Sequence, residues 1–547
     1  MIYKYGIDFG TTNSSIAKTI DDYGSKVTEV YKLRLEREEL GNVLPSIACI
    51  NEYGEIYSCD EALNYSFETD GLYKQLIKKV KMHLKEHPNG EEELFGVQSG
   101  VKKETSDIIA EILRKLRIKA EKIDEENGEK IDFSGVIMGV PVGFTDNQKR
   151  LLEKSLLKAG FYETEEMAQK KTEFISEPVA VAINYGLKFD RDQNVLIFDF
   201  GGGTLDIAVV ALKEQTEHEK YPHRILSKVG ADIGGEYLNE LFFENCIAKK
   251  YGVEYLAEKL GEHKCLQYDT KKEKCKALWD ALISGENQSG IDLINEVDEL
   301  KRELSYEERK EIEPYLKHDD ILLDTRVFRR SEFEDAIEDA IQIIKDKIEQ
   351  CIDEANVNVS DIDQVLLAGG SSLIPCIIKI LKDKFGKEKM RRYSIPSSEE
   401  IMLGVVRGLS IAGCKEHDDD IYVDDIVDCD YGILAVDKET GEDKVSVIIK
   451  KGTRVAETQI NEQDISQGIY RKYTSEDMAA DDIVIETYEN DEVIGRFNIR
   501  KPRTDKFRIY MSVDPKKGWL TVHMYDTKHE SWIKDIPLEK RSFVTKK

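Results

Sequence analysis

Aspartate residues stand beside glycine- and threonine-rich turns at two places in the sequence. Residues 7–17 are IDFGTTNSSIA, and residues 198–208 are FDFGGGTLDIA. The two segments align without a gap, and each predicts a strand, a tight turn and a second strand. Glycine lets several backbone N–H groups point at one anion. The repeated phrase therefore predicts two related halves that clamp a phosphate chain between them.

The carboxylates and hydroxyls of these segments suit a site for magnesium and phosphate. Mg²⁺ prefers oxygen ligands and is commonly held by one or two carboxylates together with substrate phosphates. We expect Asp8 and Asp199 to face each other across a cleft, and Asp206 to orient a water molecule or a monovalent cation. Aspartates that only cap turns would explain either segment alone but not the repetition. Hydroxyl and N–H donors for the phosphates would come from Thr11, Thr12 and Thr204.

Two more segments could contact the same ligand. Residues 365–375, VLLAGGSSLIP, predict a buried strand that ends at Gly369-Gly370 and leads into a helix. The glycines would let a ring or a ribose lie on the backbone, and helix N-termini favour anions. Glu177 precedes Pro178 and predicts a carboxylate fixed at a helix start, where it could position an attacking water. As the alternative, Ser-Glu-Pro is a common way to begin a helix.

Composition narrows the class of protein. A chain of 547 residues is too long for one hydrophobic core, which predicts three or four domains or lobes. The formal net charge of −28 disfavours nucleic acid and anionic membranes as partners. We expect no signal peptide, and the sequence contains no apolar stretch of about eighteen residues. The nine cysteines include no Cys-x-x-Cys pair, which predicts free thiols in a reducing cytoplasm.

Hydrophobic periodicity predicts an α/β part that is followed by an all-β part. Residues 1–413 form the α/β part, with strands expected at 2–9, 14–20, 45–50, 134–140, 194–200, 205–212 and 363–369 and helices at 105–122, 146–159, 235–250, 331–355 and 374–385. The acidic run 414–425 predicts a linker. Alternation and turn signals in 426–540 predict antiparallel strands, and 541–547 form a short tail.

The motifs resemble those of the actin-like ATPases, and within that superfamily those of the seventy-kilodalton heat-shock chaperones. The resemblance rests on both repeated segments and on VP at 140–141, ISEP at 175–178, IGGE at 233–236, DELKRELS at 298–305 and LAGGS at 367–371. Past the linker, IGRFNI at 494–499 and VDPKKGWLTV at 513–522 resemble late strands of the family's β domain. The resemblance implies an actin-like nucleotide-binding domain of two duplicated lobes, followed by an antiparallel β-sandwich of the peptide-binding type.

The function that the resemblance implies is that of an ATP-dependent chaperone, which hydrolyses ATP to control its binding of polypeptide clients. The implied cofactors are ATP or ADP, Mg²⁺ and K⁺, and the implied helpers are a J-domain co-chaperone and a nucleotide exchange factor. The implied catalytic residues are Lys81 (with Lys78 and Lys79 as rivals), Glu177, Asp199 and Thr204, and the implied metal ligands are Asp8, Asp199 and Asp206. The residues implied to hold the nucleotide are Gly10, Thr11, Thr12, Asn13, Gly201, Gly202, Gly203, Gly234, Gly235, Lys301, Arg302, Ser305, Gly369, Gly370 and Ser371.

Several residues depart from the pattern of the family. Leu373 stands where relatives have an arginine over the adenine ring, while Ser398 and Asn239 replace aspartates, so we expect modest nucleotide affinity. Glu173 replaces a basic residue that relatives use in co-chaperone contact. Asp424 interrupts the apolar stretch of the linker, so we expect weakened coupling between the domains.

The resemblance also implies a peptide groove, for which the candidates are Ile469, Tyr473, Ile483 and Ile485, although two or more of these could equally be core residues. Relatives follow the β domain with a helical lid, whereas this sequence runs only seven residues past Lys540, so we expect an open groove and fast peptide exchange. Two other functions compete. One is a nucleotide-gated binding or regulatory module with little turnover, and the other is a small-molecule kinase, against which the β domain stands.

Overall fold

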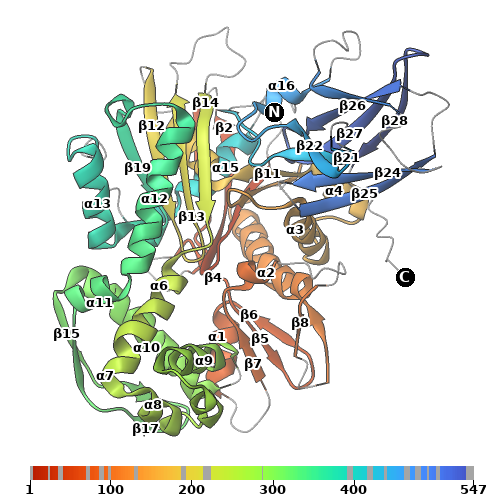
Figure 1. Ribbon diagram of the computed structural model, residues 1–547. Helices are drawn as coiled ribbons and strands as arrows, with labels where there is room; N and C mark the ends of the chain where they lie inside the picture. Colours follow the sequence, from red (N-terminus) through yellow and green to blue (C-terminus); the bar gives the residue numbers. More distant parts are fainter. Residues whose placement is uncertain are drawn as a thin grey trace.

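Two mixed β-sheets form the centre of the α/β part of the chain (Figure 1). In the first sheet the strand order is β11 (Thr172–Ser176), β10 (Val136–Val140), β1 (Tyr5–Phe9), β2 (Asn13–Asp22) and β3 (Ser25–Val30), with β4 (Leu44–Pro45) paired to β2. β1, β10 and β11 are parallel, whereas β2 and β3 are antiparallel to their neighbours. The computed structural model describes residues 4–22, 25–34, 41–68, 74–84, 92–96, 100–128, 134–186, 192–212, 223–285, 287–390, 398–414, 423–436, 440–460, 468–474, 482–489, 492–500 and 506–537.

The second sheet repeats part of this arrangement. Its strand order is β19 (Gln364–Ala368), β12 (Gln193–Phe200), β13 (Leu205–Leu212), β14 (His223–Ala231) and β20 (Val423–Asp424). The β12–β13 hairpin is antiparallel and has the parallel strand β19 at its side, as the β1–β2 hairpin has β10 at its side. Both repeated sequence segments thus form hairpins, as their pattern predicts.

Two helices, α5 (Glu177–Gly186) and α15 (Gly404–Gly413), lie between the sheets. They approach closely because Gly408 of α15 faces the carbonyl of Ala180, where a Cβ atom would collide with the backbone. Val181, Leu409 and other apolar side chains of this helix pair fill the core between the sheets. This packing fixes how the two hairpins are placed relative to one another.

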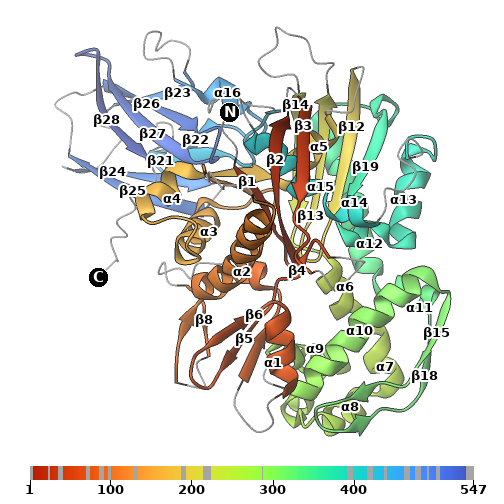
Figure 2. The same ribbon diagram turned by 180° about the vertical axis from the view of Figure 1, so that it is seen from behind.

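Further helices cover the outer faces of the sheets, as the turned view in Figure 2 shows. The first sheet packs on α2 (Thr105–Glu126) and α3 (Asp146–Lys158), and the second on α6 (Gly235–Phe242), α12 (Glu338–Ala355) and α13 (Pro375–Phe385). α2 buries Ile109, Ile112 and Leu116 at helical spacing, which gives it one apolar face for the sheet. None of the helices in the described ranges combines the length and the apolar character needed to cross a membrane.

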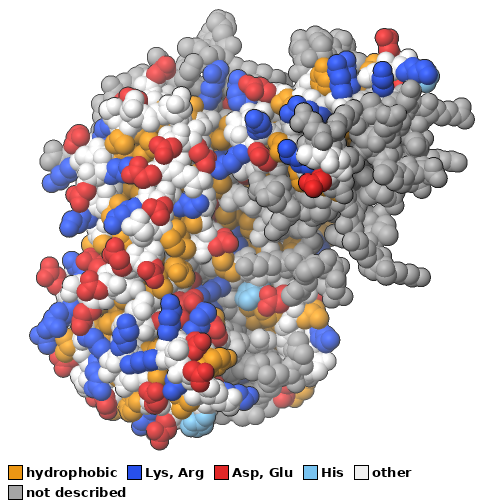
Figure 3. All heavy atoms as spheres, in the orientation of Figure 1, with side chains coloured by type: hydrophobic (Ala, Val, Ile, Leu, Met, Phe, Trp, Pro, Cys, Tyr) orange, Lys and Arg blue, Asp and Glu red, His pale blue; other side chains and the backbone are white. Residues whose placement is uncertain are grey.

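Two smaller lobes lie beyond the sheets, at the bottom of Figure 1. One contains β5 (Ala48–Asn51), β6 (Ile56–Ser58), α1 (Asp60–Glu68), β7 (Lys74–Ile77), β8 (Leu94–Phe95) and β9 (Lys103–Glu104), and the other contains α8 (Val253–Lys259), α9 (Lys271–Ile283) and α10 (Gln288–Tyr306). They touch where Leu76 N–H donates to Gly285 O at 3.1 Å and where Ile291 joins the apolar side chains of the opposite lobe. Acidic and basic side chains are interspersed over the lobe at the lower left of Figure 3, which contains α8, α9 and α10.

The structure differs from the predicted elements at three places in this part. The helix expected at 235–250 contains a π-helical turn, Phe243–Ile247, before it continues as α7 (Ala248–Tyr251). The helix expected at 331–355 is divided into α11 (Arg330–Ala336) and α12, because Ile337 leaves helical geometry with φ −103° and ψ 14°. Two short hairpins, which the sequence pattern did not predict, lie between α10 and α11: β15 (Arg309–Ile312) with β18 (Arg326–Arg329), and β16 (Tyr315–Leu316) with β17 (Ile321–Leu322).

The C-terminal part consists of two antiparallel four-stranded sheets. The first has the order β22 (Asp443–Ile449), β21 (Tyr431–Val436), β24 (Asp482–Glu489) and β25 (Glu492–Arg500), and the second β23 (Tyr470–Thr474), β26 (Lys506–Val513), β27 (Leu520–Asp526) and β28 (Ser531–Pro537). Ile433, Phe507 and Leu520 lie in their common core. The alternating pattern in the sequence predicts this antiparallel β domain.

Candidate nucleotide site

The two repeated turns lie against each other. Thr11 and Thr12 belong to the turn between β1 and β2, and Gly202 and Gly203 belong to the turn between β12 and β13. A Cβ atom at Gly202 would collide with Thr12 Oγ1, and a Cβ atom at Gly203 would collide with Thr11 Oγ1. Because a larger residue would separate the turns, the glycines permit direct contact between the two halves.

Neighbouring glycines continue this close packing. Gly234, which precedes α6, lies so near the backbone of Gly202 that a Cβ atom would overlap it. Gly369 has φ +72° and follows β19, and a Cβ atom there would lie 2.7 Å from Asp199 Oδ1. At Gly10 a Cβ atom would collide with Asn13 O, the same atom that accepts from the Gly10 N–H at 3.1 Å. The backbones of these segments therefore approach one another closely beside Asp199, with little side-chain bulk between them.

Three aspartates meet at this contact. Asp199 and Asp206 are cross-strand partners in the β12–β13 hairpin, and they are 5% and 1% exposed. Asp8 lies on β1 and Glu177 begins α5. Burial raises the pKa of Asp8 to about 7 and that of Asp206 to about 8, and the charge of Glu177 adds to both shifts. Burial also raises the pKa of Asp199, and the like charges of Glu177, Asp206 and Asp8 raise it further.

Lys81 provides a positive charge at the centre of this group. It lies on a 3₁₀ turn, Val80–His83, and its Nζ is 2.5 Å from Glu177 Oε1. Burial alone would lower the pKa of Lys81, but Glu177 and Asp8 outweigh it and raise the pKa. Its rivals point elsewhere: Lys78 Nζ donates to Asn295 Oδ1 at 2.6 Å, and Lys79 Nζ lies 3.7 Å from Glu236. Of the three lysines, Lys81 is therefore the one whose ammonium lies beside Glu177 and the three aspartates.

The residues expected around the adenosine converge beside the second hairpin. Lys301 Nζ donates to Gly235 O at 2.9 Å, and Ser371 Oγ donates to Gly201 O at 2.8 Å. Thus α10, the N-terminus of α6 and the turn after β19 meet at one place. Ser305 Oγ donates to Lys301 O at 3.1 Å within α10, so its hydroxyl is engaged by its own helix.

Asp298 also belongs to this group, although the sequence pattern did not predict a role for it. Its carboxylate lies 2.8 Å from Lys301 Nζ and 2.6 Å from Arg302 Nη2, and it accepts from Asn239 Nδ2 at 3.1 Å. Although burial would raise the pKa of Asp298, Lys301 and Arg302 hold it below its usual range. The i,i+3 and i,i+4 spacing of Asp298 to the two cations was the available signal.

The carboxylates fit a metal that is shared with a bound phosphate. Asp206 Oδ1 accepts from Val142 N–H at 2.7 Å, while the buried Oδ2 of Asp206 lacks a hydrogen-bond partner. No three acidic, histidine or cysteine side chains in the described part of the chain close into a metal cage of their own. Mg²⁺ does not require such a cage, because it keeps waters and shares its coordination with phosphate oxygens.

Two of the departures from the family pattern have a clear structural setting. Glu173, on β11, is buried and accepts from Lys4 Nζ at 2.6 Å, so its carboxylate is engaged inside the first half of the protein. Leu373 is half-buried at the end of the 3₁₀ turn Gly370–Leu373. Ser398 begins α14 (Ser398–Met402), and its side chain lies outside the described residues.

The four peptide-groove candidates divide into two groups. Tyr473 is 6% exposed and packs on Phe507 with ring centroids 6.2 Å apart, and Ile469 packs against the same core. The buried position of Tyr473 agrees with the core alternative that the sequence left open. The side chains of Ile483 and Ile485 lie outside the described residues.

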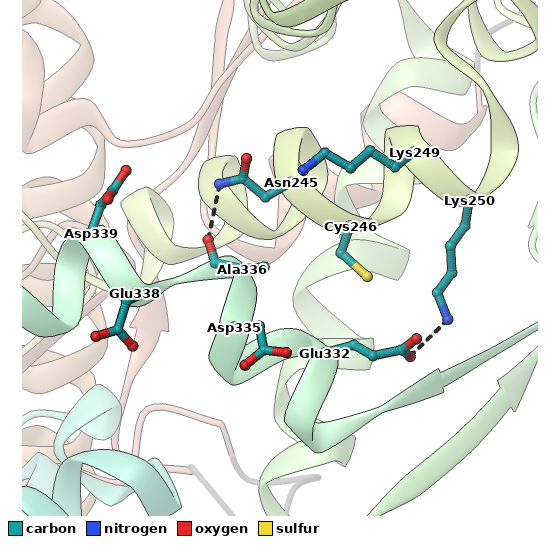
Figure 4. A pocket seen from close by; sticks show the side chains of 9 residues that line it. All are labelled: Asn245, Cys246, Lys249, Lys250, Glu332, Asp335, Ala336, Glu338 and Asp339. Carbon is teal, nitrogen blue, oxygen red and sulfur yellow. Dashed lines mark hydrogen bonds and ion pairs between the residues drawn. The ribbon is translucent and has the colours of Figure 1, made fainter.

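A pocket of about 490 Å³ lies beside the π-helical turn (Figure 4). Asn245 and Lys249 line one wall, and Asp335 and Asp339 line the wall formed where α11 meets α12. It contains none of the residues that the sequence motifs single out, and both aspartates are exposed. The sequence motifs therefore give no reason to place a nucleotide in this pocket.

Fold and site together define an α/β protein in which two glycine turns bring buried carboxylates and a lysine to one place, joined to an antiparallel β domain. The family described as Hsp70 protein matches residues 4–546, and the chain belongs to that family. It is 26% identical to the chaperone protein DnaK of Deinococcus proteolyticus over 448 residues, 79% of this chain and 63% of the relative. It is similar to the DnaK proteins of Deinococcus deserti (26% over 468 residues, 83% and 66%) and Thermosipho africanus (25% over 419 residues, 76% and 60%). The chain thus spans less than two thirds of the length of these relatives.

Proposed function

We propose that this protein is an ATP-hydrolysing chaperone that uses ATP to control its binding of polypeptide clients. The observation that carries the proposal is the meeting of Lys81, Glu177 and three aspartates where the two glycine turns touch. Phosphoryl transfer needs mainly positioning and charge stabilisation, which such a group supplies. Membership of the Hsp70 family supports the same activity. We further propose that the two central sheets are the duplicated lobes of an actin-like nucleotide-binding domain.

Each group at the site has a role in this proposal. Asp8, Asp199 and Asp206 would hold Mg²⁺ and K⁺ together with the phosphates of ATP or ADP, and the metal would supply charge stabilisation to the phosphates. Glu177 would orient the attacking water, and Lys81 would approach the terminal phosphate. N–H groups of the two turns and the hydroxyls of Thr11, Thr12 and Thr204 would bind phosphate oxygens.

The adenosine would lie where α10, α6 and the turn after β19 meet. Lys301 and Arg302 would contact it from one side, and Gly369, Gly370 and Ser371 from the other. Leu373 offers apolar contact where relatives have an arginine, which is the basis for expecting modest affinity.

We propose partners from the sequence similarity of this chain to proteins named chaperone protein DnaK. We propose extended polypeptides as clients of the β domain, held by backbone hydrogen bonds and side-chain pockets. A J-domain co-chaperone and a nucleotide exchange factor are further proposed partners. No disulfide joins any of the nine cysteines, which all lie in the described residues, and we propose a reducing cytoplasm as the compartment.

Steady-state ATP hydrolysis, measured with and without a library of peptides, tests this proposal. We expect magnesium-dependent turnover that the peptides alter, and a loss of turnover in Asp8→Asn. Wild-type turnover no greater than that of Asp8→Asn would contradict the ATPase assignment and favour a nucleotide-gated binding module. Turnover that no peptide alters would contradict the coupling to client binding.

A further inference from the structure

The segment that joins the two domains contains a charged strand. Val423 and Asp424 form β20, which pairs in parallel with His223 and Arg224 at the edge of the second sheet. Asp424 is only 3% exposed. A buried carboxylate is costly unless it is paired and hydrogen-bonded. The sequence predicts that Asp424 weakens the coupling between the domains. Whether it does so depends on which cation pairs with its buried carboxylate.

That partner comes from the β domain. Arg454 Nε donates to Asp424 Oδ2 at 2.5 Å, and Nη2 donates to the same oxygen. Arg454 is held at this place by its backbone, which forms a β-bridge with Ile426, while the next residue, Val455, donates its N–H to Asp425 O at 2.8 Å. The charge that interrupts the apolar linker is therefore matched by a cation 30 residues later in the sequence.

The adjacent aspartate faces the other domain. Asp425 Oδ1 accepts from Lys228 Nζ on β14 at 2.8 Å, and the same ammonium lies 2.6 Å from Asp428 Oδ1. The side chain of Lys228 is 4% exposed, whereas that of Asp425 is 33% exposed, so the lysine is the buried member of this pair. Asp424 and Asp425 thus bind cations of opposite domains, although they are neighbours in the sequence.

We propose that Asp424 and Arg454 form a clamp that fixes the β domain to the linker strand, and that breaking this ion pair releases β20 from β14. Asp425 and Lys228 hold the same strand to the α/β domain. On this proposal Asp424 strengthens domain docking, contrary to the expectation from its charge alone. The clamp is a property of the docked arrangement and does not depend on ATP hydrolysis.

Asp424 and Arg454 are buried to different extents, so the proposal predicts different effects for the loss of each. Arg454 is about a third exposed by side chain (36%), whereas the Asp424 side chain is 2% exposed. Removing the arginine leaves a carboxylate buried without its cation, whereas removing the aspartate leaves an arginine that can reach water. Loss of Arg454 should therefore release the strand more than loss of Asp424, since a charge left unpaired in the interior costs more than the pair contributes.

Hydrogen–deuterium exchange of the full chain, followed by mass spectrometry, measures the release of β20 directly. In the peptide that contains Val423 and Asp424, we expect Arg454→Met to accelerate exchange by about tenfold or more, and Asp424→Leu to accelerate it by less. The double variant Asp424→Leu with Arg454→Met should exchange within about threefold of the wild-type rate, because an apolar pair can replace a buried ion pair.

Glu457→Gln is the matched control. Glu457 is exposed, and its Oε1 lies 3.6 Å from Arg454 Nη1, so its loss removes a charge from the same arginine without changing Asp424. Its exchange should equal that of wild type. Peptides from the β12–β13 hairpin show in the same experiment that each variant is folded.

Two results would overturn the clamp. One is wild-type exchange of the linker peptide in Arg454→Met, and the other is a double variant that exchanges as fast as the sum of the single effects predicts. A chain that hydrolyses no ATP but shows the expected exchange pattern would contradict the proposed function and leave the clamp in place.

Discussion

Asp199 is the residue at which catalysis and folding can be separated most clearly. Its buried carboxylate has a raised pKa, so the charged form is held in the fold at a cost rather than stabilising it. We expect Asp199→Asn to lower ATP turnover by about a hundredfold, which corresponds to about 3 kcal/mol of lost electrostatic stabilisation. The melting temperature should be unchanged or higher.

Single-turnover hydrolysis and thermal unfolding of the same preparation measure both effects. Asp383→Asn, on the exposed face of α13, is the control and should leave turnover at the wild-type level. Near wild-type turnover in Asp199→Asn would remove the β12–β13 hairpin from the mechanism.

Asp298 should make the stability of the protein depend on pH. Lys301 and Arg302 lower its pKa in the folded state, so the aspartate contributes stability above the unfolded value of 3.8. That contribution is lost as the pH falls through the lower, folded pKa. We expect Asp298→Asn to reduce the free energy of unfolding by about 1 kcal/mol at pH 7, the usual contribution of one hydrogen-bonded pair.

Urea unfolding at a series of pH values measures this contribution. The difference between wild type and Asp298→Asn should be constant from pH 7 to about 5 and should shrink below about pH 4. A difference that grows as the pH falls would mean that the carboxylate is protonated in the folded protein at neutral pH.

At the scale of elements, the strands that carry the site could be predicted from the sequence and several other elements could not. Asp8, Asp199 and Gly369 follow short apolar runs, and a run of this kind with a glycine turn leaves few alternatives to a strand. The β15–β18 hairpin has only four residues in each strand and alternates weakly within a charged region, so local pattern gave no signal. The break at Ile337 coincides with a change of packing partners, which periodicity does not report: α11 packs on α6, α10 and β18, whereas α12 packs on β13 and β14.

The contact of α5 with α15 gives a prediction at this scale. Gly408 faces the Ala180 carbonyl with no room for a methyl group, whereas Gly404, on the same helix, has its nearest neighbour 3.9 Å from where a Cβ would lie. We expect Gly408→Ala to lower the free energy of unfolding by about 2–3 kcal/mol, the usual cost of overpacking a core. Gly404→Ala should instead be neutral or stabilising by up to about 1 kcal/mol, since alanine favours the helix.

Equilibrium unfolding in urea compares the two alanine variants directly. The order of stability, Gly404→Ala above wild type or equal to it and Gly408→Ala below, is the expected outcome. Equal stability of the two variants would show that α5 and α15 can move apart without cost, and that the hairpins they support are not rigidly placed.

At the scale of the whole molecule, the joining segment shows the limit of reasoning from local sequence. Its acidic composition predicts a linker. Within this segment the structure describes residues from Val423 onward, because residues 415–422 lie outside the described ranges. Val423 and Asp424 nevertheless form a strand of the second sheet, because Lys228 and Arg454 supply the charges that the segment needs. These cations lie far from the segment in sequence, so no local pattern could show that the aspartates would be buried.

The last prediction concerns how the β domain is held against the first sheet. Lys517 Nζ lies 2.8 Å from Glu153 Oε1 on α3 and 4.0 Å from the centroid of the Trp519 ring, and both charged side chains are buried. Beside this pair, Phe174 N–H of β11 donates to Lys516 O at 2.9 Å. Since removal of one partner of a buried ion pair costs about 3–5 kcal/mol, Lys517→Met should weaken docking strongly.

Scanning calorimetry of the full chain tests this expectation. In the wild type we expect the docked β domain to unfold together with the α/β domain, and in Lys517→Met we expect an earlier, separate transition for the β domain, because it has lost its main polar anchor. Lys528→Met, on the exposed turn after β27, is the matched control and should keep the wild-type profile. The double variant Lys517→Met with Glu153→Gln should recover part of the loss, because the buried charge is then removed along with its partner. An unchanged profile in Lys517→Met would place the docking energy elsewhere, in the linker clamp and in the backbone contact at Phe174.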